Sequence, residues 1–135
     1  MLKAINHINI RTTDYQRMKA LFVDVLGLTP GWRPNIARSE GAWLYLGEQP
    51  IVHLSAAAEP TAPSRGSVFD HVALEIEDYD EARRRLDALD MEYSTNVIEG
   101  RGRQITFVAP GGATLELFCP DPAPSAAEAG ALAQA

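Results

Sequence analysis

The sequence predicts an α+β fold built from two tandem βαβββ modules, because one pattern of residues occurs twice along the chain. The segment NHINIRTTDY (6–15) aligns with DHVALEIEDY (70–79), with the two histidines 71 − 7 = 64 residues apart. A second pair, PIVHLS (50–55) and ATLELF (113–118), aligns at nearly the same offset, 116 − 53 = 63. In each copy, a segment with strand-like alternation precedes one with helical periodicity. A tandem repeat of this kind indicates two similar supersecondary units.

We expect one domain over residues 1–119, divided into module one at 1–55, a linker at 56–67 and module two at 68–119. The linker is rich in alanine, proline and serine, as connecting segments are. The tail at 120–135 is rich in proline and alanine and is expected to dock loosely, with a short helix at 125–134.

Each module is expected to contain one strand, one helix and three further strands. In module one the first strand covers 4–10. The helix covers 14–26, with Thr13 or Asp14 as its N-cap and Gly27 after its end. The remaining strands of this module are expected at 31–38, 42–47 and 50–55.

Module two repeats this order. Its first strand covers 70–76 and its helix 79–89, where Asp78 and Glu81 have the spacing of a capping box. The later strands are expected at 92–98, 103–109 and 113–119. Gly47 in module one and the Gly111-Gly112 pair in module two supply turns between strands.

Composition excludes several classes of partner. The net charge of −6 argues against nucleic acid and anionic membranes as main partners. The chain has no apolar run near the roughly 20 residues that span a bilayer, and its start does not resemble a signal peptide. The single cysteine, Cys119, cannot form an intrachain disulfide, so a cytoplasmic location is expected.

Four potential metal ligands occupy matching places in the two modules. On the strands that carry His7, His53, His71 and Glu116, one face is aliphatic and the other is mixed. Singly, a strand histidine is more often a satisfied structural residue, and Glu116 alone would face solvent. The four residues together indicate a common binding partner, because enclosed imidazoles and carboxylates need to be paired or coordinated. Three imidazoles and one carboxylate suit a divalent transition metal: Zn, Fe(II), Mn, Ni or Co.

These motifs resemble those of the vicinal oxygen chelate superfamily, which includes glyoxalase I, extradiol dioxygenases, and the fosfomycin- and bleomycin-resistance proteins. The resemblance covers about residues 3–119 and rests on the repeat and on segments such as DVLGL (24–28) and FVAPGGATLELF (107–118). It implies that the two modules form a cup-shaped, barrel-like mixed β-sheet around a divalent ion. The family's ligand positions fall on His7, His53, His71 and Glu116. The resemblance also implies a homodimer, in which module one of one subunit meets module two of the other.

Three activities are compatible with this resemblance. The first is a metal-dependent lyase or isomerase of glyoxalase I or epimerase type, acting on a small substrate with vicinal oxygens, with Glu116 or His53 moving the proton. In those enzymes the second ligand position usually carries Glu or Gln, where this chain has His53. The second is an Fe(II) extradiol dioxygenase-like enzyme that uses His7, His71 and Glu116. The third is a non-catalytic, antibiotic-binding protein of bleomycin-resistance type.

Five further residues are candidates for substrate binding. Arg11 matches an arginine that glyoxalase I uses for glutathione. Trp43 and Tyr45 alternate on one face of a predicted strand and either line the cup or pack within the sheet. Gln104 begins a predicted strand, and Arg103 beside it is either an anion contact or a solvated charge.

Overall fold

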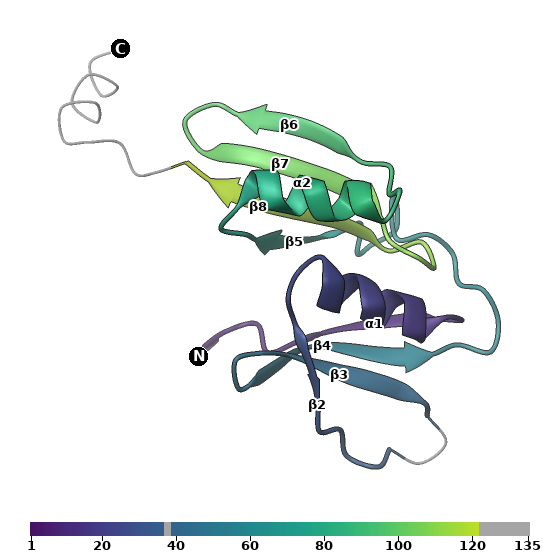
Figure 1. The fold of residues 1–135 in the computed structure, drawn as a ribbon. Helices are drawn as coiled ribbons and strands as arrows, with labels where there is room; N and C mark the ends of the chain where they lie inside the picture. Colours follow the sequence, from purple (N-terminus) through teal and green to yellow (C-terminus); the bar gives the residue numbers. More distant parts are fainter. Residues whose placement is uncertain (37–38, 122–135) are drawn as a thin grey trace.

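A computed structural model describes residues 1–36 and 39–121 and contains two four-stranded sheets with one helix each (Figure 1). The first half contains β1 Ile8–Thr12, α1 Tyr15–Asp24, β2 Thr29–Gly31, β3 Gly41–Leu46 and β4 Gln49–Ala56. The second half contains β5 Val72–Glu75, α2 Tyr79–Ala88, β6 Ser94–Ile98, β7 Gly102–Val108 and β8 Thr114–Pro120. The predicted α+β fold with two βαβββ units is confirmed.

Both sheets have the same topology. Sheet one has the strand order β1-β4-β3-β2, and sheet two has the order β5-β8-β7-β6. In each sheet the first and last strands of the unit pair in parallel, and all other neighbours are antiparallel. The first strand is therefore an edge strand, and the last strand lies in the interior beside it. This topology brings His53 next to β1, and it brings Glu116 next to β5.

The two helices begin at the predicted aspartates. The Asp14 carboxylate accepts a hydrogen bond from the Arg17 amide at 3.1 Å, and the Asp78 carboxylate accepts one from the Glu81 amide at 2.9 Å. These bonds satisfy amides that have no partner within the helix. The capping box is only half formed, because the Glu81 side chain accepts hydrogen bonds from Arg84 and Arg85.

The predicted strand at 31–38 is wrong at residues 32–36, and its residues 37–38 lie outside the described part of the chain. The strand that pairs with β3 is only Thr29–Gly31, and residues 32–36 are outside any strand. A proline nitrogen carries no hydrogen to donate to a sheet, and Pro34 interrupts this segment. The Tyr45 hydroxyl also donates to the Trp32 carbonyl oxygen at 2.5 Å. In a continued strand, this oxygen would instead accept a hydrogen bond from the neighbouring strand. The helix predicted at 125–134 lies outside the described residues.

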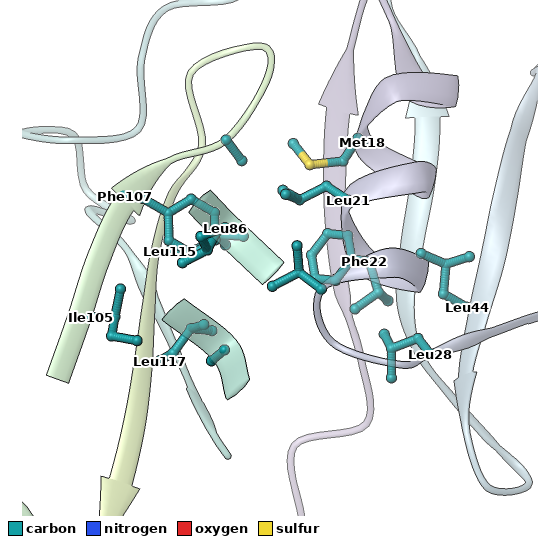
Figure 2. Close-up of a cluster of buried hydrophobic side chains, with 14 of the residues drawn as sticks. Met18, Leu21, Phe22, Leu28, Leu44, Leu86, Ile105, Phe107, Leu115 and Leu117 are labelled. Atoms are coloured by element: carbon teal, nitrogen blue, oxygen red, sulfur yellow. The ribbon is translucent and has the colours of Figure 1, made fainter. Parts of the chain in front are cut away.

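One hydrophobic core joins the two halves. Buried side chains of α1 and sheet one meet those of α2 and sheet two in a single cluster, which includes Met18, Phe22, Leu44, Leu86 and Leu117 (Figure 2). In Figure 1, α1 lies between the two sheets. The sheets are thus joined through their helix-covered faces and do not close into a barrel within the chain. The opposite faces, here called the open faces, carry the polar residues.

Neither α1 nor α2, the helices of the described part of the chain, has the length and apolar character that crossing a membrane requires.

A turn in sheet two is packed directly on the end of β1. Gly111 has a φ of +90°, and a Cβ atom there would overlap the Thr12 hydroxyl and lie 2.9 Å from the Thr12 Cβ. Thr12 itself is buried. We expect Gly111→Ala to destabilise the protein by about 1–3 kcal/mol, through backbone strain plus overpacking. Denaturant unfolding measures this loss.

Gly47→Ala is the matched control for that variant. Gly47 also has a positive φ, +61°, but nothing lies within 4 Å of its added Cβ. The control therefore carries the backbone strain without the steric overlap. Equal losses in the two variants would contradict the packing of Gly111 on Thr12.

Candidate metal centre

The open face of sheet one carries a stack of three aromatic rings. Asn9, His53 and Trp43 are paired neighbours across β1, β4 and β3. The Trp43 ring lies nearly parallel to the His53 ring, with centroids 4.0 Å apart and 11° between planes. The His7 ring stacks on His53 at 3.8 Å and 13°. Two parallel rings at these distances occupy opposite sides of His53 and hold it in one orientation.

His53 has an unsatisfied nitrogen. Its Nε2 atom is buried and has no hydrogen-bond partner among the described residues. Burial is the largest cause that lowers the pKa of His53 below its ordinary value of 6.5, and the nearby His7 lowers it further. A hydrogen bond to the Pro50 backbone acts in the opposite direction. The structure therefore favours a neutral imidazole at His53, which is the form that binds metals.

The lowered pKa of His53 predicts a pH dependence of stability. The unfolded chain takes up a proton near pH 6.5, whereas folded His53 resists it to a lower pH. The free energy of unfolding is therefore expected to fall as the pH drops below about 6.5, until the folded pKa is passed. Urea unfolding of metal-free protein at several pH values measures this fall. His53→Gln is expected to remove it, and an unchanged fall in that variant would contradict the assignment.

The open face of sheet two brings His71 and Glu116 together. The His71 Nε2 atom lies 3.3 Å from the Glu116 Oε2 atom. The side chain of Glu116 is 15% exposed and that of His71 is 45% exposed. Gln104 on β7 donates a hydrogen bond from Nε2 to the other carboxylate oxygen, Oε1. This bond leaves Oε2 as the oxygen directed at the imidazole.

In both His7 and His71, the Nδ1 atom lies next to a side-chain oxygen of the preceding residue. The His7 Nδ1 atom lies 2.7 Å from the Asn6 Oδ1 atom, and the His71 Nδ1 atom lies 2.7 Å from the Asp70 Oδ2 atom. A ring that donates from Nδ1 carries its lone pair on Nε2. In the neutral ring, His71 then directs a lone pair at a carboxylate oxygen, and both atoms are acceptors.

Two acceptor atoms this close repel each other unless a cation lies between them, either a proton on the imidazole or a metal ion. Two ligand atoms bound to one ion at about 2.1 Å, with an angle of about 90–110° between them, are about 3.0–3.4 Å apart. The 3.3 Å separation of His71 Nε2 and Glu116 Oε2 falls in this range. Together with the unsatisfied Nε2 of His53, the donor set fits a divalent transition metal.

The chain does not bring all four predicted ligands into one cluster. His7 and His53 lie together in the first half, and His71 and Glu116 lie together in the second. Among the described residues, no group of three or more His, Cys, Asp or Glu side chains is close enough to hold a metal ion. His7 and His71 do line one cleft of about 610 Å³, which extends along β1 and past the first residues of β5 and β8.

The predicted substrate residues occupy different places. Arg11 lies on β1 opposite Ser55, one row beyond His53, at the same cleft. Trp43 stacks on His53, whereas Tyr45 donates to the Trp32 backbone. Arg103 does not share a face with Gln104. Its guanidinium lies 4.2 Å from the centre of the Tyr79 ring of α2.

Four polar residues with side-chain hydrogen bonds at the open faces were not predicted from the sequence. Asn6 and Asp70 contact the histidines that follow them. On sheet one, the Ser55 hydroxyl donates to the Asn9 side-chain oxygen at 2.9 Å. A usable signal was present for the first two, because Asn6 and Asp70 are equivalent positions of the repeat.

The two sheets of equal topology, each formed by a βαβββ unit, define a fold of the glyoxalase class, and comparisons with known proteins agree. A family model described as Glyoxalase/Bleomycin resistance protein/Dioxygenase superfamily matches residues 6–107. The chain therefore belongs to this superfamily, the vicinal oxygen chelate superfamily. The match includes His7, His53 and His71 and ends before Glu116.

Three similar proteins illustrate the range of the superfamily. Glyoxylase I 4 of Arabidopsis thaliana is 25% identical over 123 residues, which are 86% of this chain and 70% of that protein. The uncharacterized protein YaeR of Escherichia coli K12 is 31% identical over 126 residues, 87% and 96% of the two chains. A variant of the fosfomycin resistance protein FosX of Listeria monocytogenes, solved with Mn(II) and 1S,2S-dihydroxypropylphosphonic acid, has the same fold. Its TM-score is 0.73 at 17% identity, over 90% of this chain and 95% of that one.

Proposed function

We propose that this protein is a divalent-metal-dependent lyase or isomerase of glyoxalase I or epimerase type, acting on a small substrate with vicinal oxygens. The observation that carries the proposal is the pair of acceptor atoms on sheet two, His71 Nε2 and Glu116 Oε2, 3.3 Å apart. The unsatisfied His53 Nε2 on sheet one supports it. The Mn(II) in the FosX variant supports a divalent ion in a protein of this fold.

The proposed centre is completed by a second copy of the chain. His7 and His53 of one subunit would meet His71 and Glu116 of the other, since the chain alone keeps the two pairs apart. The edge strands β1 and β5 support this arrangement, because unpaired strand edges are templates for pairing with another chain. Just before these strands stand four strongly exposed apolar residues: Leu2 (91%), Ile5 (86%), Val68 (96%) and Phe69 (88%).

In this proposal, different residues of the chain hold the ion, move the proton and contact the substrate. His7, His53, His71 and Glu116 would hold the ion, which when bound acts as a Lewis acid toward two adjacent substrate oxygens. Glu116 is the first candidate to move a proton, because Gln104 fixes its carboxylate and its side chain is 15% exposed. His53 is the second candidate, as a base in place of its ligand role, because a neutral imidazole has one free lone pair and can serve in only one of the two roles. Arg11 and Trp43 would contact the substrate.

Metal titration of chelator-treated protein, combined with its mass in solution, tests the proposal. We expect about one Zn, Ni, Mn or Fe(II) ion per chain and a dimer by size-exclusion light scattering. Methylglyoxal with glutathione and 2-substituted thioester substrates then test lyase and epimerase activity. Oxygen consumption with a catechol on the Fe(II) protein would instead identify a dioxygenase. Failure to take up any of these ions in stoichiometric amount would contradict the enzyme and leave a metal-free binding protein.

A further inference from the structure

The carboxylate of Asp70 has two hydrogen-bond partners on different sides. Its Oδ2 atom lies 2.7 Å from the His71 Nδ1 atom, and its Oδ1 atom accepts from the Gly66 amide at 2.6 Å. An aspartate carboxyl with its ordinary pKa of about 3.9 is ionised at neutral pH. An ionised carboxylate only accepts hydrogen bonds, and the shared proton therefore belongs to His71 Nδ1.

The segment that carries Asp70 is fastened to sheet two. The Ser64 hydroxyl donates to the Asp70 carbonyl oxygen at 2.8 Å and accepts from the Thr114 amide at 2.8 Å. Thr114 is the first residue of β8, the strand of Glu116. The backbone at Asp70 is thus held relative to β8 without using the imidazole contact.

Module one has an amide where module two has a carboxylate. Asn6 is the repeat equivalent of Asp70, and its Oδ1 atom lies 2.7 Å from the His7 Nδ1 atom. This is the one hydrogen bond of the Asn6 side chain among the described residues, and an amide has one oxygen with which to accept it. Asp70 serves two donors with two oxygens. The difference between the two modules therefore follows from the number of donors each residue must satisfy.

We propose that Asp70 is a positioning residue that fixes His71 in the Nδ1–H tautomer and so directs the Nε2 lone pair toward Glu116, a task that an amide cannot perform at this position. This inference rests on the proposed function only for its consequence, which is metal affinity. The tautomer itself is a property of the metal-free protein.

The substitution Asp70→Asn tests why a carboxylate is needed. If the amide oxygen keeps the Gly66 hydrogen bond, the amide NH₂ group faces His71 Nδ1 and donates to it. The imidazole must then carry its proton on Nε2, where it can no longer bind a metal. Asn6→Asp is the matched control, because a carboxylate can accept from His7 Nδ1 as the amide oxygen does, and the His7 tautomer should stay unchanged.

Proton–nitrogen NMR of ¹⁵N-labelled, metal-free protein reads the tautomers directly, at about pH 8, above the usual histidine pKa of about 6.5. The His71 signals are assigned with a His71→Gln variant. In the native protein we expect pyrrole-like Nδ1 and pyridine-like Nε2 shifts for His71, and Asp70→Asn should interchange them. A His71 ring that keeps the same tautomer in native protein and in Asp70→Asn would overturn the proposal.

Ser64→Ala separates positioning from a loss of local structure. This variant removes the anchor of the segment but keeps the carboxylate beside the ring, so the Nδ1–H tautomer should persist. If Ser64→Ala changed the tautomer as Asp70→Asn does, the Asp70 effect would be structural, and the proposal would fail.

Metal affinity gives the second readout. We expect Asp70→Asn to weaken Ni²⁺ or Zn²⁺ binding by about 10–100-fold, as loss of a ligand-orienting partner does, and Asn6→Asp to change it by less than about threefold. An inverted tautomer with unchanged metal affinity would overturn His71 Nε2 as the atom that Asp70 prepares for a ligand role. Native protein that binds no metal but shows the predicted tautomers would contradict the proposed function and leave the role of Asp70 in setting the tautomer standing.

Discussion

Glu116→Gln is expected to lower the affinity for a divalent transition metal by at least about 100-fold. The substitution keeps the size of the side chain but replaces a charged oxygen ligand by an amide, and ligands contribute no less than the 10–100-fold typical of residues that merely orient them. Glu116 faces His71 across 3.3 Å, and its side chain is 15% exposed. Competition titration against a chelator of known affinity measures the change.

Glu75→Gln is the matched control for this variant. Glu75 lies at the end of β5, four residues after His71, and its side chain is exposed. It carries the same charge as Glu116, so a general effect of net charge would weaken binding equally in both variants. Our account predicts no more than about a twofold change for Glu75→Gln, because charge-only effects at exposed sites are screened by salt. Similar losses in the two variants would contradict Glu116 as a ligand.

Phe22→Ala is expected to cost about 3–5 kcal/mol of folding stability. Phe22 is 0% exposed and belongs to the cluster that joins the two halves (Figure 2). Removal of a buried phenyl ring loses its transfer free energy and leaves a cavity that the surroundings fill only partly. A loss of this size is a large part of the 5–15 kcal/mol typical of a domain. Urea unfolding of the metal-free protein measures it.

Leu46→Ala provides the comparison on the surface. Leu46 ends β3 and is 62% exposed, so its truncation is expected to change stability by less than about 0.5 kcal/mol. If Phe22→Ala cost as little as Leu46→Ala, the shared core between the two halves would be contradicted.

The repeat made most of the fold predictable from the sequence. Alternation and an N-cap aspartate occur at equivalent places in both halves, and Asp14 and Asp78 both cap their helices as expected. The prediction failed at one place where the two modules differ. In module two the corresponding strand forms as β6, whereas residues 32–36 lie outside any strand, and their conformation depends on tertiary contacts such as the hydrogen bond from Tyr45 to Trp32. Local propensity cannot anticipate such contacts.

For the four candidate ligands, the strand faces that carry them were predictable, but the arrangement of their side chains was not. The sequence indicated which four side chains share open faces, because strand alternation sorts them. It did not indicate that His53 would be stacked between two rings or that Asp70 would contact His71. Arg103, near the start of β7, was grouped with Gln104 as a candidate for substrate binding. The single-residue alternation of β7 directs Gln104 to Glu116 and Arg103 to Tyr79, so a residue beside a site residue faces the other way.

The most direct test of a shared metal centre mixes two inactive chains. One chain carries His7→Gln and His53→Gln, and the other carries His71→Gln and Glu116→Gln. Each variant alone is expected to lack tight metal binding. After unfolding and refolding together, half of the dimers are mixed, and each mixed dimer holds one intact site of two, so about a quarter of the native metal-binding capacity should return. No recovery in a mixture shown to contain mixed dimers would contradict the shared centre.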